Sequence, residues 1–215
     1  MAVSQLFSAG GVTMWPLLIC SVLAIALIVE RSLFWLRLNR RQKRFLREVI
    51  ELYRHDPAQI SSKLQQYIDL PLARIFLAAV LLEDPNPEEY RLALESEAQA
   101  ELPLLKRFST IFDTIVALAP LLGLLGTILG LISSFASLSL GDVGGTQTAG
   151  VTAGISEALV STAAGLIVAI VTLVFSNIFR GLYQRQLGLI QQYGGQMELI
   201  YRRRYERAGR GYAST

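Results

Sequence analysis

The feature that most constrains the fold of this chain is a stretch of 72 residues, 108–179, without a single Lys or Arg. Its only charged side chains are Asp113, Asp142 and Glu157. All 20 basic residues of the protein lie on either side of it, in 31–107 and 180–210. A stretch so poor in positive charge and so rich in Leu, Ala, Ile and Gly is expected to lie in lipid, where it is long enough for two membrane-crossing helices.

The overall composition favours a membrane protein and argues against a nucleic-acid-binding one. With 215 residues and 52% hydrophobic side chains, the chain is too apolar for an ordinary soluble domain of this size. The 13 Lys and Arg of residues 31–107 are interleaved with 11 Asp and Glu. Such mixing is typical of solvated helix faces, not of a basic footprint for nucleic acid, so no nucleic-acid partner is expected.

Cysteine and histidine each occur once, as Cys20 and His55. One cysteine excludes a disulfide framework within the chain, and one histidine excludes a His-based metal cluster. A Ser/His/Asp triad with His inside the apolar stretch is excluded for the same reason. We therefore expect no metal, no cofactor and no enzymatic activity.

Three uncharged runs are long enough to cross a bilayer, which takes about 20 helical residues. They are Val12–Val29 with 18 residues, Thr114–Gly141 with 28 and Ala158–Phe179 with 22. From these runs we predict transmembrane spans at 12–30, 112–137 and 152–179. No basic residue precedes the first run and no A-x-A site follows it before Arg31, so we interpret it as a retained span and not a cleaved signal peptide.

The distribution of basic residues predicts the orientation of these spans. Lys and Arg cluster after span one, before span two and after span three, whereas 1–11 and 138–150 have none. The positive-inside rule then places the N-terminus outside and the C-terminus in the cytoplasm. Segments 1–11 and 138–151 are expected to be extracytoplasmic, and 31–111 and 180–215 cytoplasmic.

The parts of the chain outside the spans also have helical patterning. Apolar residues keep helical spacing from Phe34 to Leu52, so the first helix is expected to continue past its span. Asp56-Pro57 and Pro85-Asn86-Pro87 predict breaks, and Pro87 a helix start. From Pro87 the helix is expected to run into span two without a strong stop, with a kink at Pro103. The third span starts near Val151 and its helix continues to about Gly209. With no strand pattern, the predicted fold is all-α: a three-span integral membrane protein whose long helices extend into the cytoplasm.

Small residues recur every three or four positions along spans two and three. They are Gly123, Gly126 and Gly130 in span two and Ala158 and Gly165 in span three. Gly126 and Gly130 form a GxxxG pair, and such stripes allow helix backbones to approach closely in lipid. We predict that these five residues pack helix against helix.

Glu157 is an acid near the outer end of span three. It lies about 35 Å of helix from Arg180, at the outer edge of a hydrocarbon core about 30 Å thick. An acid at this depth is a candidate for an ion pathway. It can equally reach external water and stabilise the first turn of the helix through the helix dipole. Both interpretations stay open.

Thr127 and Thr162 lie at similar depths, about 20 Å and 27 Å from the inner ends of their spans. A hydroxyl in a membrane helix usually bonds only its own i−4 carbonyl. Two hydroxyls on small-residue faces can also line a polar channel and hold a water chain that relays protons. Asn177 is either the inner partner of that path or an interfacial residue. None of the spans has a carboxylate at mid-depth, which implies that a partner supplies one.

The two paired segments resemble a known family. LAPLLGLLGTILGLISSF at 118–135 and GISEALVSTAAGLIVAI at 154–170, followed by Asn177, are similar to the two hallmark spans of the MotA/TolQ/ExbB proton-channel family. The Glu30-Arg31 exit from span one and the size of the chain match its ExbB/TolQ branch. MotA is larger and has an extra span, which disfavours a role in flagellar torque.

The resemblance implies an ExbB-like subunit of a homopentamer in the bacterial inner membrane. The ring would enclose transmembrane helices of an ExbD-like single-span protein, whose membrane aspartate is the missing acid. Proton flow would then drive motion passed to a TonB-like protein that energises outer-membrane uptake. By motif position, the pore-lining threonines of the family fall on Thr127 and Thr162, and its conserved glutamate on Glu157.

Two positions depart from the family pattern, and two other functions stay open. Val171 stands where members usually have Pro, and Ser176 where they often have Tyr, which leaves the role of Asn177 open. A TolQ-like subunit that maintains the envelope is one alternative, and a passive scaffold that packs partner helices is the other. Membrane lipids are also expected partners, with anionic lipid near Arg180 and Arg185.

Overall fold

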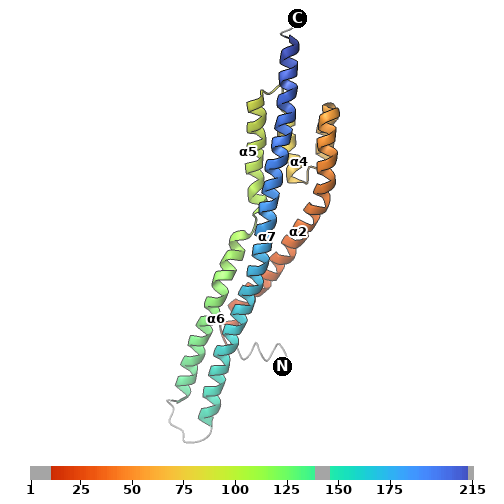
Figure 1. Ribbon diagram of the computed structural model, residues 1–215. Helices are drawn as coiled ribbons and strands as arrows, with labels where there is room; N and C mark the ends of the chain where they lie inside the picture. Colours follow the sequence, from red (N-terminus) through yellow and green to blue (C-terminus); the bar gives the residue numbers. More distant parts are fainter. Residues whose placement is uncertain (1–10, 139–145, 213–215) are drawn as a thin grey trace. The chain divides into compact units, whose positions relative to one another are not determined.

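A computed structural model of the chain describes residues 11–138 and 146–212, which are almost entirely helical and contain no strand in those ranges. The helices, labelled as in Figure 1, are α2 (Met14–His55), η1 (Pro57–Gln59), α3 (Ile60–Gln66), α4 (Pro71–Val80), α5 (Pro87–Leu105), α6 (Ser109–Leu138) and α7 (Thr146–Tyr212). The predicted all-α class is confirmed.

The chain divides into two compact units, and α2 and α7 contribute to both. The first unit joins the chain up to Arg31 with Phe108–Phe179, and the second joins Ser32–Arg107 with Arg180–Thr215. These boundaries fall where the blocks of basic residues begin and end. Charged side chains are costly in a lipid-facing unit, so the charge pattern and the division into units coincide.

Three helical stretches of the described chain are long and apolar enough to cross a membrane. They lie within Met14–His55, Pro87–Ser137 and Gly150–Arg207. The predicted number of spans is thus confirmed by helix length and composition. The extracytoplasmic segments expected at 1–11 and 138–151 lie mostly outside the described residues, as does Asp142.

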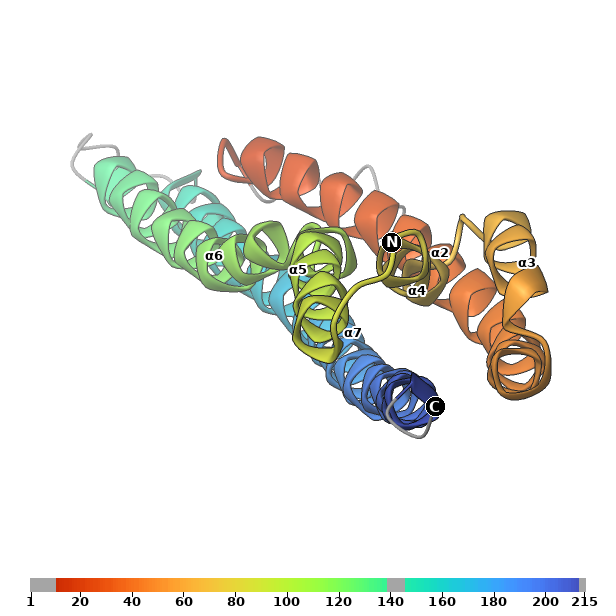
Figure 2. The same ribbon diagram turned by 90° about the horizontal axis from the view of Figure 1, so that it is seen from above.

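In the first unit α6 and the first part of α7 lie side by side, as both views show (Figures 1 and 2). The first part of α2 packs against them through a cluster of Leu27, Ile28 and Phe112. Three further aromatic rings surround this cluster, and those of Phe112 and Phe179 have centroids 5.7 Å apart. Many other large apolar side chains of this unit are exposed, as expected for helices that face lipid.

The second unit has a core of large buried side chains from four helices. They come from α2 (Phe45, Val49), α4 (Leu72, Phe76), α5 (Tyr90) and α7 (Ile190, Met197). The rings of Phe45 and Phe76 are stacked with centroids 6.4 Å apart. This core explains why α2 continues past its apolar run, since the predicted helical spacing after Phe34 places one face of the helix in the core.

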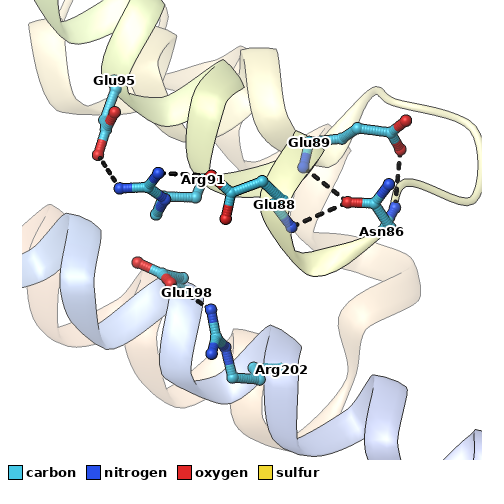
Figure 3. A network of polar contacts seen from close by, with 7 residues as sticks. All are labelled: Asn86, Glu88, Glu89, Arg91, Glu95, Glu198 and Arg202. Carbon is cyan, nitrogen blue, oxygen red and sulfur yellow. Dashed lines mark hydrogen bonds and ion pairs between the residues drawn. The ribbon is translucent and has the colours of Figure 1, made fainter.

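The start of α5 is fixed by a capping box, shown in Figure 3. The Asn86 side chain accepts hydrogen bonds from the backbone N–H groups of Glu88 and Glu89, both 2.9 Å long. The Glu89 carboxylate accepts in return from the Asn86 N–H at 2.8 Å. Together with Pro87 at the first helical position, these bonds satisfy the free donors of the first turn. The predicted start at Pro87 is confirmed.

The prediction that this helix runs on into span two is wrong. It ends at Leu105, and α6 begins at Ser109 after a turn. Phe108 has a φ of 68°, a left-handed conformation that a helix cannot contain. Its ring belongs to the aromatic surroundings of the Phe112 cluster and lies 5.4 Å from the guanidinium carbon of Arg31. These contacts stabilise a backbone conformation that local propensity disfavours.

The bounds of α7 also differ from those expected. The helix begins at Thr146, earlier than Val151, and ends at Tyr212, past Gly209. It is unbroken at Val171, where members of the resembled family usually have Pro. With a free N–H at that position, the hydrogen-bond ladder of the helix continues without a kink.

Candidate functional site

The contact between α6 and α7 is formed by glycines on both helices. A Cβ added at Gly165 would lie 2.6 Å from the carbonyl oxygen of Ala119. One added at Gly130 would lie 2.7 Å from the carbonyl oxygen of Gly154 and 3.0 Å from the Cβ of Ala158. Any side chain at Gly165 or Gly130 would separate the two backbones, so their approach depends on glycine.

Gly123 and Gly126 form the middle of the same contact. A Cβ at Gly123 would lie 3.1 Å from both the Ser161 carbonyl oxygen and the Thr162 Cα. One at Gly126 would lie 2.5 Å from the Cβ of Ser161, which is completely buried. The structure thus brings together the five residues expected to pack, Gly123, Gly126, Gly130, Ala158 and Gly165.

Three hydroxyl groups donate hydrogen bonds to backbone carbonyls at this contact. Thr162 Oγ1 donates across the helix pair to Gly123 O at 3.1 Å. Ser161 Oγ donates within its own helix to Ala158 O at 2.9 Å. The buried Ser134 lies 3.0 Å from Gly130 O and 3.1 Å, across the pair, from Val151 O. Polar groups therefore line a glycine-rich seam that the flanking apolar side chains shield.

Thr127 lies one turn along α6 from Gly123, the acceptor of Thr162. Its Oγ1 donates to Leu124 O at 2.6 Å, within its own helix, and the side chain is half-buried. Each of the two predicted relay residues therefore donates to a backbone carbonyl of α6. Thr127 makes the local bond usual for a hydroxyl in a membrane helix, whereas Thr162 links two helices.

Glu157 approaches the backbone at the start of α2. Gly11 has a φ of 67°, and a Cβ added there would overlap the Glu157 carboxylate. Glycine is therefore needed at this position for two reasons, its left-handed backbone and the proximity of the carboxylate. Glu157 is half-buried. Sequence reasoning did not predict this pair, although the Gly10-Gly11 doublet ahead of the first span was a signal for it.

Asn177 is exposed, whereas its chain neighbour Ser176 is buried. Thr172, which the sequence analysis did not single out, and Ser176, noted there only as a departure from the family pattern, are 0% and 6% exposed. Thr172 Oγ1 donates to Val168 O at 2.7 Å. Their spacing from Ser161 and Gly165 continues the small-residue stripe toward the C-terminal end of the helix, which was the signal available.

Charged residues lie where the first span ends and where the second begins. Arg31 is 3% exposed and forms two hydrogen bonds with Glu30, of 2.6 Å and 2.9 Å. Asp113 lies on the first turns of α6 and is exposed. Apart from Glu30 and Asp113, the described parts of the three predicted spans contain no acid other than Glu157, and no group of three or more His, Cys, Asp or Glu suited to a metal occurs among the described residues.

Comparison of the sequence with known proteins assigns the chain to a family. Residues 40–192 match the MotA/TolQ/ExbB proton channel family. The putative biopolymer transport protein ExbB-like 3 of Synechocystis sp. is 59% identical over 91% of this chain and 93% of its own length. ExbB-like 1 of the same organism is 40% identical over 91% of this chain and 78% of its own length.

A biopolymer transport protein ExbB from Salmonella typhimurium is 42% identical over 35% of this chain and 31% of its own length. These relatives are named as biopolymer transport proteins, and the matched family is one of proton channels. With three apolar helices and a match that covers most of its length, this chain is an ExbB-like membrane protein and belongs to the MotA/TolQ/ExbB proton channel family.

Proposed function

We propose that the protein is a subunit of a proton-driven motor in the bacterial inner membrane. It works with an ExbD-like single-span partner and passes motion to a TonB-like protein that energises outer-membrane transport. The assembly is a homopentamer, with the N-terminus of each subunit periplasmic and the C-terminus cytoplasmic. Family membership and the distribution of basic residues support this proposal.

The observation that carries the proposal is a seam rich in hydroxyls and free of carboxylates at mid-depth. Ser134, Ser161 and Thr162 line it, and Asp113 and Glu157 lie toward its two ends. Hydroxyls can pass protons but cannot store them near neutral pH, so the group that loads and unloads must come from another chain. Each charge that crosses 100 mV yields about 2.3 kcal/mol, enough to drive a conformational step.

In this proposal Thr127 and Thr162 are relay residues, Glu157 lies at the outer entrance and Asn177 at the inner one. Both threonine hydroxyls now donate to carbonyls, at 2.6 Å and 3.1 Å. Relay requires each hydroxyl to rotate toward the conduit. A neutral hydrogen bond contributes only about 1 kcal/mol net, so thermal motion at ambient temperature can break it and allow the hydroxyl to rotate.

The test compares Thr162→Val with Thr162→Ser in proteoliposomes that contain the full complex with its single-span partner. Valine keeps the shape but not the hydroxyl, whereas serine keeps the hydroxyl. We expect Thr162→Val to lower proton flux, followed with an internal pH dye, by at least tenfold and Thr162→Ser to retain most of it. Thr114→Val, which removes a hydroxyl bonded to Thr110 O near the inner end of α6, is the control.

A passive scaffold is the second candidate, because the Thr162 bond to Gly123 O is by itself a helix-packing contact. A scaffold predicts that Thr162→Val weakens complex assembly, measured by size exclusion, and that no proton flux exists in the wild type. Flux in the wild type, with intact assembly of Thr162→Val, supports the motor. Proton flux at the wild-type level in an assembled Thr162→Val complex would show that Thr162 is not part of the proton pathway.

A further inference from the structure

The second unit contains a hollow of about 540 Å³ in which four arginines converge. They are Arg54, Arg203, Arg204 and Arg207, and Gln196 also lines the hollow. The remaining lining residues are uncharged. Four guanidinium groups without an acid in the lining form a strongly positive site that the proposed motor function does not use.

Two helix ends place these arginines together. Arg54 lies in the last turn of α2, and the other three lie near the C-terminal end of α7. Arg203 and Arg207 are four residues apart and therefore lie on one face of the helix. Like charges at this spacing repel one another, so the cluster has a cost unless an anion or solvent neutralises it.

Arg204 has a structural role that holds the cluster in place. Its Nη2 donates to the carbonyl oxygens of Tyr53 and Arg54, the latter at 3.1 Å. Its guanidinium carbon also lies 4.7 Å from the centroid of the Tyr53 ring. Arg204 therefore caps the end of α2 and fixes Arg54 beside α7.

The other three arginines differ from nearby arginines of the same unit because they have no acidic partner among the described residues. Figure 3 shows Arg91 paired with Glu88 and Glu95, and Arg202 paired with Glu198 at 3.2 Å. The side chains of Arg54, Arg203 and Arg207 are exposed and form no ion pair with any residue in the described part of the chain. The N–H donors of their guanidinium groups are thus available to a ligand.

We propose that this hollow is a binding site for a phosphate-bearing anion, either a soluble oligophosphate or a phospholipid headgroup. Guanidinium groups match the oxygens of phosphate in paired hydrogen bonds, and several of them together select a multiply charged ligand. Basic residues near helix C-termini also complement the helix dipole without any ligand. That explanation predicts an effect on stability and none on binding, which the following experiment separates.

The probe is inorganic tripolyphosphate, titrated by calorimetry into the purified full-length protein in neutral detergent. The variant Arg203→Gln/Arg207→Gln leaves the structural Arg204 untouched. Arg37→Gln/Arg40→Gln is the matched control, because it removes the same charge from two exposed arginines of α2 outside the hollow. We expect the first variant to raise Kd at least tenfold, from the loss of charged hydrogen bonds, and the control to change it less than twofold.

Equal weakening in the two variants, or no binding of tripolyphosphate or lipid probe at millimolar concentration, would overturn the proposal. The source of the phosphate is distinguished with soluble dihexanoyl phosphatidylglycerol, with dihexanoyl phosphatidylcholine as its uncharged counterpart. Tighter binding of the anionic lipid than of tripolyphosphate, lost in the hollow variant, assigns the site to a headgroup, and the reverse order assigns it to a soluble anion. Preferential binding of hexaglutamate would contradict a phosphate site.

Discussion

At the scale of single residues, the ion pair of Arg74 and Glu101 in the second unit joins a partly exposed side chain to a buried one. Glu101 is 3% exposed, and its carboxylate accepts two hydrogen bonds from Arg74, of which the one from Nη2 is 2.6 Å long. Arg74 also donates to Ile68 O at 2.8 Å and is more exposed than its partner. The hydrogen bond with Glu101 raises the pKa of Arg74, which stays charged.

This asymmetry predicts different costs for the two halves of the pair. Arg74→Met leaves a buried carboxylate without a partner and should destabilise the protein by about 3 kcal/mol or more. Glu101→Gln leaves an arginine that reaches water and should cost clearly less. Thermal unfolding of the full-length protein in detergent measures both. Equal losses would show that burial of Glu101 is not what determines the cost.

Like Glu101, Tyr90 is a titratable residue whose side chain is buried in the second unit. It is 1% exposed, and its ring stacks on that of Tyr201 with centroids 4.2 Å apart. Burial, with a smaller contribution from the neighbouring Tyr53, raises the pKa of the Tyr90 phenol far above 10. Burial raises the pKa values of Tyr53 and Tyr201 as well. The Tyr90 hydroxyl forms no hydrogen bond of standard geometry with any described residue.

These shifts predict a loss of stability in alkali. The folded state favours the neutral phenol, so its contribution is complete below the unfolded pKa of about 10 and is lost as the pH rises toward the folded value. Tyr90→Phe should therefore shift the alkaline unfolding midpoint, followed by circular dichroism from pH 8 to 12, to higher pH. Tyr205→Phe, at an exposed ring, is the control. A midpoint unchanged in Tyr90→Phe would contradict this expectation.

At the scale of the elements, α7 contains glycines in two opposite environments. Gly165 lies against α6, whereas a Cβ at Gly188 would meet nothing within 4 Å. Glycine within a helix costs up to about 1 kcal/mol relative to alanine, so its presence needs a reason at each position. Close packing is the reason at Gly165.

The same substitution should consequently have opposite effects at two positions of one helix. Gly165→Ala should destabilise the protein by about 1–3 kcal/mol, because its Cβ would lie 2.6 Å from Ala119 O. Gly188→Ala should be neutral or stabilise by up to about 1 kcal/mol through helix propensity. Both are measured as shifts in Tm of the detergent-solubilised protein. Destabilisation by Gly188→Ala would show that its face contacts something in the native assembly.

At the scale of the whole molecule, the distribution of Lys and Arg predicts the membrane orientation. Cys20 is the only cysteine, so a Cys20→Ser background permits single reporters at Ser4→Cys and Ser214→Cys. In intact spheroplasts, a membrane-impermeant maleimide should label the first reporter and not the second, which should react only after permeabilisation. Labelling of the second reporter in intact spheroplasts would contradict the proposed orientation.

Much of this molecule follows from local sequence. The three apolar helices, the breaks at Pro57 and Pro85 and the start of α5 at Pro87 were predicted correctly. The glycines of α6 that were predicted to pack, from their spacing alone, lie against α7. Each of these depends on a property of a short segment: the cost of charge in lipid, the missing N–H of proline, or the side-chain period of a helix.

Contacts between distant segments were decided only by the tertiary structure. The turn at Phe108 exists because its ring packs near Arg31, the Gly11 backbone meets Glu157, and Thr162 donates to Gly123. Arg203 and Arg207 join Arg54 in one hollow although about 150 residues separate them in the chain. The local sequence around either residue does not predict such a contact, because the contact depends on which faces of the helices pack together.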